Sequence, residues 1–385
     1  MPEATPTSPR RSAPPSWRCP TSRRRRSSWR RCGEGAPWGT TTTRRGSGGR
    51  GSCRRSPRRP EPELSPGRSP ARPARTTTVP LIHAVVLGIA QGLTEFVPVS
   101  SSAHLELLPW FFGWQHFGGD ATREQAFDVA LHVGTLAGAV TFLRADIRRY
   151  AGAALGAVFG ARTDGRRTGG DARVGFALAL SAVPAAAAGL LLHSALVSAG
   201  EQIALIAVAL AVVGWVLWWA DRRAEQRTAA ERPTDEFGVR DAVLLGVGQA
   251  CALVPGVSRS AATIAVGRLL RFDRESAARV AFLMSLPVIA GAGVFRGLGL
   301  VGDSVPAGDL AAMGVGAAAA AATSWLVLGL VFRLLTPAGA ADGAADGAAG
   351  ARSPRRAGHR LFATAAVYRT ALAAAVAVTL LAGWR

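Results

Sequence analysis

The chain has 385 residues, of which 49% are hydrophobic, and its formal net charge is +20. Residues 1–78 contain 19 Arg against four Glu, so this first segment alone carries +15 of that charge. A strongly basic chain often binds nucleic acid, but here that interpretation rests entirely on the first segment, so we discount it. We therefore expect no nucleic acid among the partners.

Residues 1–78 are rich in Ser, Pro, Thr and Gly and show no apolar periodicity. Such a segment cannot bury enough apolar surface to offset the entropy lost on ordering, and it lacks the apolar core of a signal peptide. We expect either a disordered, Arg-rich tail or a segment that is not part of the native protein, whose translation would then begin near Val79. The rest of the chain, 79–385, is expected to form one membrane domain.

The first apolar segment contains one half of an internal repeat. Residues 87–103 align without a gap on residues 245–261, at a constant offset of 158, and Leu, Gly, Gln, Val and two Ser recur in register. Repeats inside an apolar chain are a common way to build one central site from two halves. The sequence therefore predicts repeat 1 at about 80–220 and repeat 2 at about 240–385.

Six long apolar runs, rich in Gly and Ala, alternate with charged loops. Runs of this length can cross a bilayer, and small residues allow close helix packing in lipid. A soluble bundle would need polar helix faces that these runs lack. The predicted fold is therefore an all-α polytopic integral membrane protein. The predicted spans are Phe127–Leu143, Phe176–Leu196, Ile203–Ala220, Val280–Phe295, Leu310–Phe332 and Leu361–Leu381.

The distribution of Arg predicts the topology. The loops at 144–173 and 221–240 are rich in Arg, which places both in the cytoplasm, whereas the connections at 198–201 and 299–309 are acidic. This alternation closes only if the second repeat leaves and returns on the cytoplasmic side. The first repeat would then enter from the outside. We expect inverted-topology repeats with two re-entrant helical hairpins that meet near mid-membrane.

The tip of the first hairpin carries three consecutive hydroxyls, those of Ser100, Ser101 and Ser102, directly before a predicted helix. Hydroxyls and backbone N–H groups at a helix N-terminus can bind phosphate oxygens. Capping of the helix is the alternative role of such serines.

The second tip repeats this arrangement with Ser258 and Ser260, and Arg259 takes the place of Ser101. An Arg inside a membrane is costly and usually functional, and its planar fork suits a phosphate. The alternative is that Arg259 snorkels to the surface or only pairs with Glu95.

Glu95 lies in an apolar stretch just before the first tip. A carboxylate at this depth must be protonated, paired or metal-bound, so it is a candidate general base or cation ligand. His104 follows Ser101 by three residues, close enough on a helix to accept the serine proton. A single His on an apolar face is otherwise more often structural.

Four further polar residues could support the site. Gln91 and Gln249 occupy equivalent positions in the repeat and could orient it. Asp128 and His132 lie one turn apart on a predicted span and rank below the tips. Cys251, alone in an apolar stretch, is expected to be a small buried residue.

At these residues the chain resembles a known family. Residues Gln91–His104 resemble the first signature of the undecaprenyl-diphosphate phosphatase family of the bacitracin-resistance type, and Pro255–Thr263 is similar to the second. The resemblance covers about residues 80–384 and includes the Tyr368-Arg369 pair.

Three features depart from the family pattern. Gln91 stands where many members have Glu, which leaves one carboxylate fewer for a metal. Ala103 and Ala261 stand where Gly is usual. The Arg-rich tail has no counterpart.

The resemblance implies a phosphoric anhydride hydrolase of the bacterial inner membrane, with its active site toward the extracytoplasmic face. Its reaction would convert undecaprenyl diphosphate to undecaprenyl phosphate and inorganic phosphate. This recycles the lipid carrier for peptidoglycan synthesis, supports cell shape and confers bacitracin resistance. The family also implies a divalent cation, Mg²⁺ or Ca²⁺. The sequence leaves open whether the chain acts as a homodimer.

The residue pattern and the resemblance together predict the site. Either Ser101 attacks with His104 as base, or water attacks with Glu95 positioning it directly or through the cation. A lipid-phosphate flippase or an anion transporter is the alternative function, because inverted repeats are a carrier architecture. The expected catalytic residues are Glu95, Ser101, His104 and Arg259; the expected substrate-binding residues are Gln91, Ser100, Ser102, Ser258, Ser260 and Thr263; and the expected metal ligand is Glu95, with Gln91 nearby.

Overall fold

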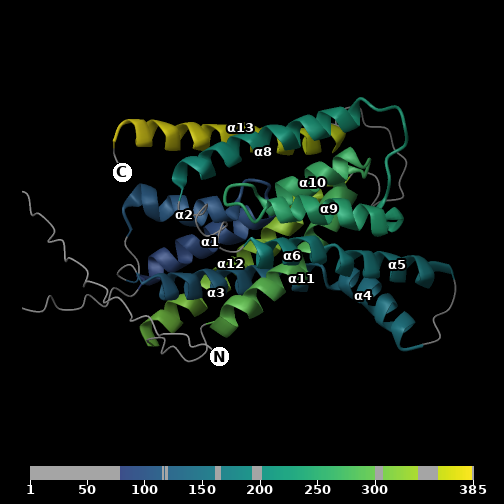
Figure 1. The fold of residues 1–385 in the computed structure, drawn as a ribbon, viewed down its shortest axis with the longest axis horizontal. Helices are drawn as coiled ribbons and strands as arrows, with labels where there is room; N and C mark the ends of the chain where they lie inside the picture. The colour runs from purple at the N-terminus through teal and green to yellow at the C-terminus, as the bar shows by residue number, and fades with distance from the viewer. Residues whose placement is uncertain are drawn as a thin grey trace, which may run out of the picture. The chain divides into compact units, whose positions relative to one another are not determined.

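The computed structural model describes residues 79–114, 117, 120–160, 166–192, 202–299, 307–336 and 354–383 (Figure 1). Within these ranges the regular structure is helical, apart from an isolated bridge between Arg232 and Phe272. The predicted disordered tail, residues 1–78, lies outside the described residues. The helices are α1 (Leu81–Phe96), α2 (Ser101–Phe112), α3 (Ala121–Phe142), α4 (Arg144–Val158), α5 (Arg166–Leu180), α6 (Ala182–Leu191), α8 (Ile203–Glu225), the short η2 (Thr234–Glu236), α9 (Val239–Cys251), α10 (Arg259–Leu269), α11 (Arg274–Gly299), α12 (Ala307–Leu335) and α13 (Pro354–Leu381).

Five helices among the described residues are long and apolar enough to cross a membrane, and the bent pair α3 and α4 makes a sixth if it counts as one span. They coincide with the predicted apolar runs, as far as those runs are described. The prediction of an all-α, multi-pass membrane protein is therefore confirmed. The five are Gly169–Leu191 in α5 and α6, Ile203–Glu225, Arg274–Leu298, Ala307–Leu335 and Gly358–Leu381.

Two local predictions are wrong. The start of the Arg-rich segment 144–173 was expected to be a loop, but residues 144–158 form α4, which turns by 82° from α3. Its second half contains four Ala and one Leu, both strong helix formers, so the helical pattern continues past the charges. Cys251 is exposed rather than buried, because it follows the exposed Val243 and Val247 at helical spacing on the same face of α9.

Glycines on α1 and α3 allow both helices to lie very close to α12. A Cβ on Gly88 or Gly92 of α1 would overlap a carbonyl oxygen of α12, and so would a Cβ on Gly134 or Gly138 of α3. Each pair is spaced by four residues, which aligns the glycines on one helix face. The close packing predicted from the Gly-rich and Ala-rich runs thus takes the form of two glycine faces, on α1 and α3, that pack against α12.

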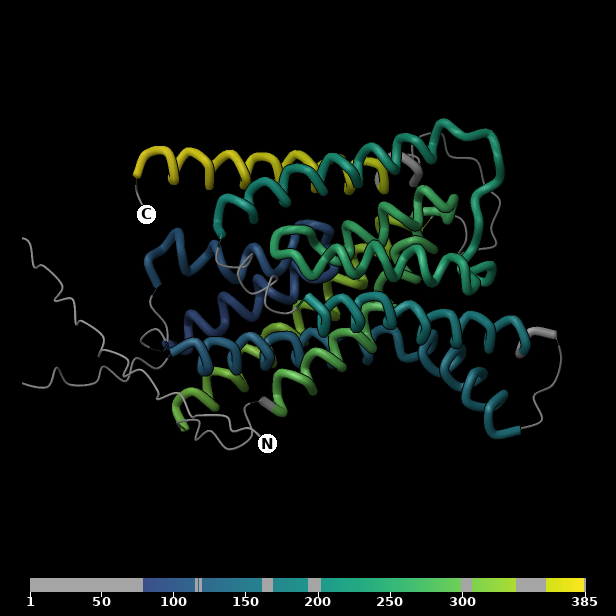
Figure 2. Tube along the Cα trace, viewed as in Figure 1, coloured from purple at the N-terminus to yellow at the C-terminus, as the bar shows by residue number. Residues whose placement is uncertain are grey.

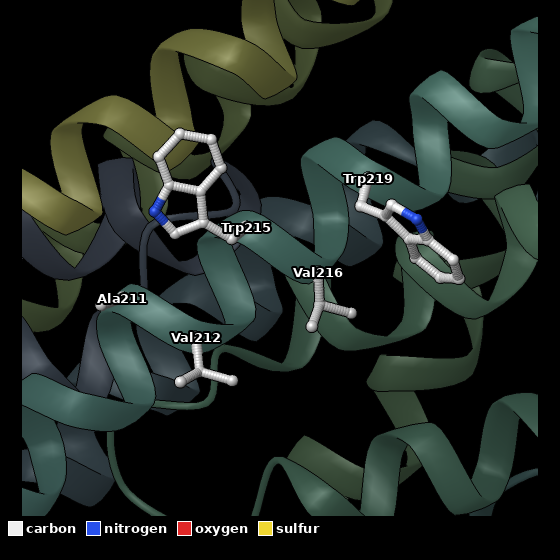
Figure 3. Close-up of a pocket in the computed structure, with 5 residues that line it drawn as sticks. All are labelled: Ala211, Val212, Trp215, Val216 and Trp219. Atoms are coloured by element: carbon white, nitrogen blue, oxygen red, sulfur yellow. The ribbon is translucent and has the colours of Figure 1, made fainter.

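The outer face of α8 is apolar, and α8 runs beside α13 (Figure 2). A shallow groove of about 450 Å³ on α8 is lined by Val212, Trp215, Val216 and Trp219, together with Ala211 (Figure 3). These four larger side chains are between 42% and 54% exposed. So much exposed apolar surface on a helix of this length fits a lipid-facing span with aromatic side chains near one end.

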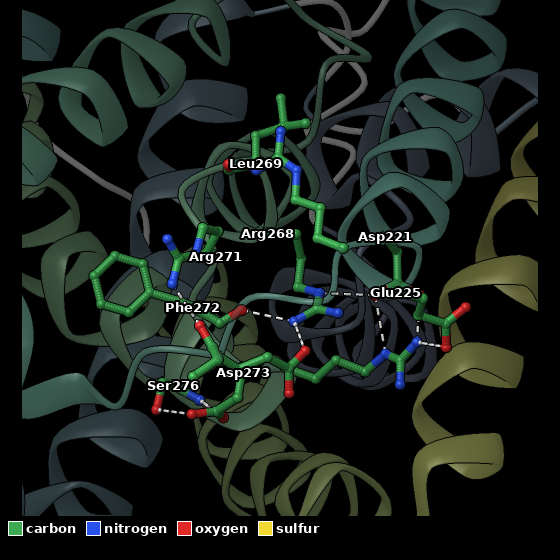
Figure 4. Close-up of polar contacts among 12 residues, drawn as sticks. Asp221, Glu225, Arg268, Leu269, Arg271, Phe272, Asp273 and Ser276 are labelled. Atoms are coloured by element: carbon green, nitrogen blue, oxygen red, sulfur yellow. Dashed lines mark hydrogen bonds and ion pairs between the residues drawn. The ribbon is translucent and has the colours of Figure 1, made fainter.

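A charged network joins α8 to α10 and α11 (Figure 4). The fully buried Arg268 donates to Asp221 at 2.8 Å and to Glu231 at 2.9 Å. Arg274 donates to the other oxygen of Asp221 at 2.7 Å and also pairs with Glu225. Asp221 is thus held by two guanidinium groups, which compensate its charge where it is buried.

Candidate functional site

The two repeated segments adopt the same local structure. In both, a helix (α1 or α9) ends, a short turn follows, and a second helix (α2 or α10) begins. The residue before the second helix has a positive φ in each case, 81° for Ser100 and 34° for Ser258. Each of these serines also has its Oγ near that of the serine two residues later, at 3.3 Å for Ser102 and 3.2 Å for Ser260. A positive φ at a residue other than Gly is strained, and such strain concentrates at functional sites.

The two tips meet at Glu95, which lies near the end of α1 and is buried. Its Oε2 accepts hydrogen bonds from Ser101 Oγ at 2.5 Å and from Gln91 Nε2 at 3.1 Å. Arg259 Nη1, from the second tip, lies 3.8 Å from Glu95 Oε1. The structure therefore brings together three of the four predicted catalytic residues, from segments more than 150 residues apart in sequence.

His104 lies beside the first tip, but it is hydrogen-bonded to Ser100 and Tyr368 and not to Ser101, the expected partner. One ring nitrogen, Nδ1, lies 2.6 Å from the carbonyl oxygen of Ser100 and must donate to it, while Nε2 lies 2.7 Å from Tyr368 Oη on α13. Ser101 is bonded to Glu95 instead. The geometry thus offers Glu95, and not His104, as the direct acceptor of the Ser101 proton.

Sequence reasoning from residue patterns did not single out Tyr368 as a site residue. It lies 264 residues beyond His104, on the part of α13 that follows its Arg-rich start. Its ring lies nearly parallel to the His104 ring, and the two ring centroids are 5.7 Å apart. The available signal was a polar pair, Tyr368 and Arg369, inside a predicted span, which is unusual enough to suggest a role.

Two of the predicted binding residues, Ser258 and Thr263, already make hydrogen bonds to the backbone of α10. Ser258 Oγ accepts the N–H of Ala261 at 3.3 Å, so it caps α10, whereas Ser100 makes no side-chain cap to α2. Thr263 Oγ1 donates to the Arg259 carbonyl oxygen within its own helix, at 2.7 Å. Because α2 and α10 both begin at the tips, their positive N-terminal ends lie there, which favours an anion.

Several buried polar atoms at the tips have no hydrogen-bond partner among the described residues. They are Oε1 of Gln91, Nη1 of Arg259 and both side-chain polar atoms of Gln249. Buried polar groups are usually paired, so these four atoms around the junction of the tips are open to a polar ligand. The carboxylate of Glu95 and the free Oε1 of Gln91 are hard oxygen donors of the kind that Mg²⁺ and Ca²⁺ prefer.

Asp128 and His132 lie on α3 and are half-buried. His132 Nδ1 donates to the Asp128 backbone carbonyl at 2.8 Å, which leaves Nε2 as the acceptor in the neutral ring. His132 lies close enough to Glu95 for the two side chains to interact electrostatically, as do Asp128 and Arg296 on α11. These residues therefore extend the polar surroundings of the site along α3.

Comparison with known proteins identifies the family. The family model of the bacitracin resistance protein BacA matches residues 84–340, which include both tips. The chain belongs to the BacA family. An undecaprenyl-diphosphatase of Geobacter sulfurreducens is 40% identical over 257 residues, which cover 66% of this chain and 90% of that relative.

Other relatives carry the same name. An undecaprenyl-diphosphatase of Thermomicrobium roseum is 38% identical over 260 residues, covering 66% of this chain and 89% of its own. One from Jannaschia sp. is 40% identical over 262 residues, covering 66% and 90%. The predicted family is therefore confirmed.

Proposed function

We propose that this BacA-family protein hydrolyses undecaprenyl diphosphate to undecaprenyl phosphate and inorganic phosphate. The observation that carries the proposal is the junction of the two tips, where Ser101 is bonded to Glu95 and Arg259 lies 3.8 Å from the same carboxylate. A nucleophile, a proton acceptor and a guanidinium thus converge. The product is the lipid carrier of peptidoglycan synthesis, so the reaction recycles that carrier, supports cell shape and accounts for bacitracin resistance.

Binding of the diphosphate follows from the charges at the tips. The Arg259 guanidinium can present two N–H groups to one phosphate, and the start of α2 offers backbone N–H groups that no side chain caps. Phosphoryl transfer depends mainly on positioning and on stabilising charge, and both are stronger where water is excluded. The isoprenoid tail remains in the lipid that surrounds the apolar helices.

Ser101 is the nucleophile in our proposal, and Glu95 is its base. The Ser101 Oγ attacks the terminal phosphorus, its proton passes to Glu95, and the bond to undecaprenyl phosphate breaks. Water then hydrolyses the phosphoserine and restores the hydroxyl. The 2.5 Å bond between the two side chains supports this assignment. His104 orders the tip through its hydrogen bond to the Ser100 carbonyl oxygen. A role for His104 as a base stays a prediction.

A divalent cation would be held by Glu95 and by Oε1 of Gln91, the oxygens identified above. Bound there, it would neutralise charge on the phosphates. Two protein oxygens suit Mg²⁺, which commonly keeps few protein ligands and completes its shell with phosphate oxygens and water.

The finer topology is part of the same proposal. We propose that α1–α2 and α9–α10 are re-entrant hairpins of opposite orientation. Each of these helices has 16 residues or fewer, short of the roughly 20 that a span needs. The matching strained serines support their equivalence, and the Arg-rich loops support opposite entry. The site would then open to the extracytoplasmic face of the bacterial inner membrane.

Phosphate release in detergent tests the function, because transport has no meaning there. Purified protein is supplied with undecaprenyl diphosphate and inorganic phosphate is measured. We expect turnover by the native protein and a loss of about 100-fold or more for Arg259→Ala, with the exposed Arg222→Ala as a matched control that keeps activity. A native protein that releases no phosphate, yet moves lipid phosphate across vesicles, would establish the transporter instead.

A further inference from the structure

One buried Arg outside the catalytic set contacts both tips. Arg369 lies on α13, and its side chain is fully buried. It donates to the carbonyl oxygens of Leu210 at 2.8 Å and Ala209 at 3.3 Å on α8. It also donates to the carbonyl oxygen of Gly256 at 2.8 Å and to that of Pro98 at 3.4 Å.

The two tip carbonyls occupy equivalent positions. Pro98 and Gly256 are separated by the same offset of 158 residues that relates the two repeats, and each precedes the strained serine of its tip by two residues. Nη1 of Arg369 binds one of these carbonyls and Nη2 binds the other. The two halves of one rigid guanidinium are therefore attached to matching points of the two repeats.

The charge of Arg369 is solvated only by peptide dipoles. No Asp or Glu among the described residues lies within ion-pair distance of it, in contrast to the buried Arg268 and its two carboxylates. A buried guanidinium without a counter-ion is costly in a membrane protein. A neutral side chain would cost less free energy to bury at this position, so the presence of a guanidinium indicates a role at the tips.

The surroundings limit how the second tip can move. Gly256 has a φ of +91°, and a Cβ there would lie 2.6 Å from the Ile206 carbonyl oxygen on α8. The tip backbone therefore lies directly against the helix whose next carbonyls, those of Ala209 and Leu210, also bind Arg369. The preceding residue, Tyr368, contacts His104 of the first tip. One turn of α13 thus reaches both tips and the helix behind them.

We propose that Arg369 is a positioning residue that fixes the two tips relative to each other and so sets the separation between Arg259 and Glu95. It touches neither substrate nor reacting atoms. The inference rests on the proposed function only in that the diphosphate is bound between the tips. A Lys has one point of attachment and cannot hold carbonyls on three segments in a planar fork, so the charge alone does not replace this group.

The experiment compares Arg369→Lys and Arg369→Gln with the native protein in detergent. Two quantities are measured: phosphate release from undecaprenyl diphosphate, and hydrogen exchange of the tip amides at 97–103 and 254–261. We expect both variants to lose about 100-fold in kcat/KM, mostly in kcat, because small misplacements of reacting groups have effects of this size. Exchange should rise at both tips.

Arg268→Lys serves as the matched control, because Arg268 is equally buried but binds Asp221, Glu231 and the carbonyl oxygen of Phe272, none of which lies on a tip. It should lower thermal stability without raising exchange selectively at the tips. The proposal is overturned if Arg369→Lys keeps native kcat, since charge would then suffice, or if tip exchange in it is unchanged. Should Arg369→Gln fail to fold, the Lys variant alone decides. Native protein that releases no phosphate would refute the proposed function, while the exchange data would still test the attachment of the tips.

Discussion

The hydrogen bond between Ser101 and Glu95 allows a direct test of the nucleophile. We predict that Ser101→Ala, Glu95→Gln and the double variant are almost equally inactive. If Glu95 works by taking the Ser101 proton, removing either member disables the same step, and the second substitution has little left to remove. If water were the nucleophile, the two side chains would act independently and their effects would multiply.

The magnitude follows from the geometry. A positioned general base contributes about 10²–10⁴ in rate, or roughly 3–5 kcal/mol, and the 2.5 Å contact places Glu95 ideally for that role. If the two side chains only held each other in place, loss of their hydrogen bond would cost only about 1.5–3 kcal/mol. We therefore expect a fall in kcat of about 10³ for each single variant and of nearly the same size for the double.

The assay is phosphate release at saturating undecaprenyl diphosphate, with thermal unfolding measured on each variant to establish that it folds. Thr141→Ala is the control, because Thr141 is exposed on α3 and its hydroxyl donates only to carbonyl oxygens of its own helix. A Ser101→Ala protein with more than about a tenth of native kcat would refute the serine nucleophile. So would a double variant whose loss equals the product of the single losses.

Three other substitutions, one of them paired with a control, test the packing and the cation. Gly134→Ala should reduce stability by about 1–3 kcal/mol or prevent folding, because its Cβ would overlap the α12 backbone; Gly152→Ala on α4, where the Cβ meets nothing within 4 Å, should be neutral or stabilising in the same thermal unfolding assay. Asp221→Asn leaves the buried Arg268 without its main counter-ion and should cost about 3–5 kcal/mol, yet the folded fraction should keep native kcat/KM; a selective loss of kcat would contradict a structural role. Gln91→Glu adds a carboxylate beside the proposed cation, so half-maximal activity after chelator treatment should return at a lower Mg²⁺ concentration; an unchanged concentration would argue against cation binding there.

Much of the architecture could be predicted from the sequence because it depends on local composition. Apolar runs predict the spans, and the constant offset of the repeat indicated that Glu95 and Arg259 belong to one site. The apolar runs are recognised within short stretches of sequence, and the repeat is recognised from the constant register between its two copies. Neither requires knowledge of how the helices are rotated about their own axes.

The partners of single side chains depended on features that helix periodicity omits. The positive φ of Ser100 turns the chain between α1 and α2, so Ser101 faces back to Glu95 although the two are on different helices. A spacing argument within α2 alone favoured His104. Tyr368 and Arg369 reach the tips through contacts that close loops of more than 100 residues, and no local pattern specifies such contacts.

The position of α12 has a consequence for how this protein can be made. This helix belongs to the second half of the sequence, yet it packs against α1 and α3 of the first half, while α6 of the first half packs against α9 of the second. The glycine faces of α1 and α3 therefore lack their partner until more than 160 further residues have been synthesised and inserted. Neither half can complete its interior alone, so the two halves form an obligate pair within one chain, and the final fold is reached only after synthesis of α12.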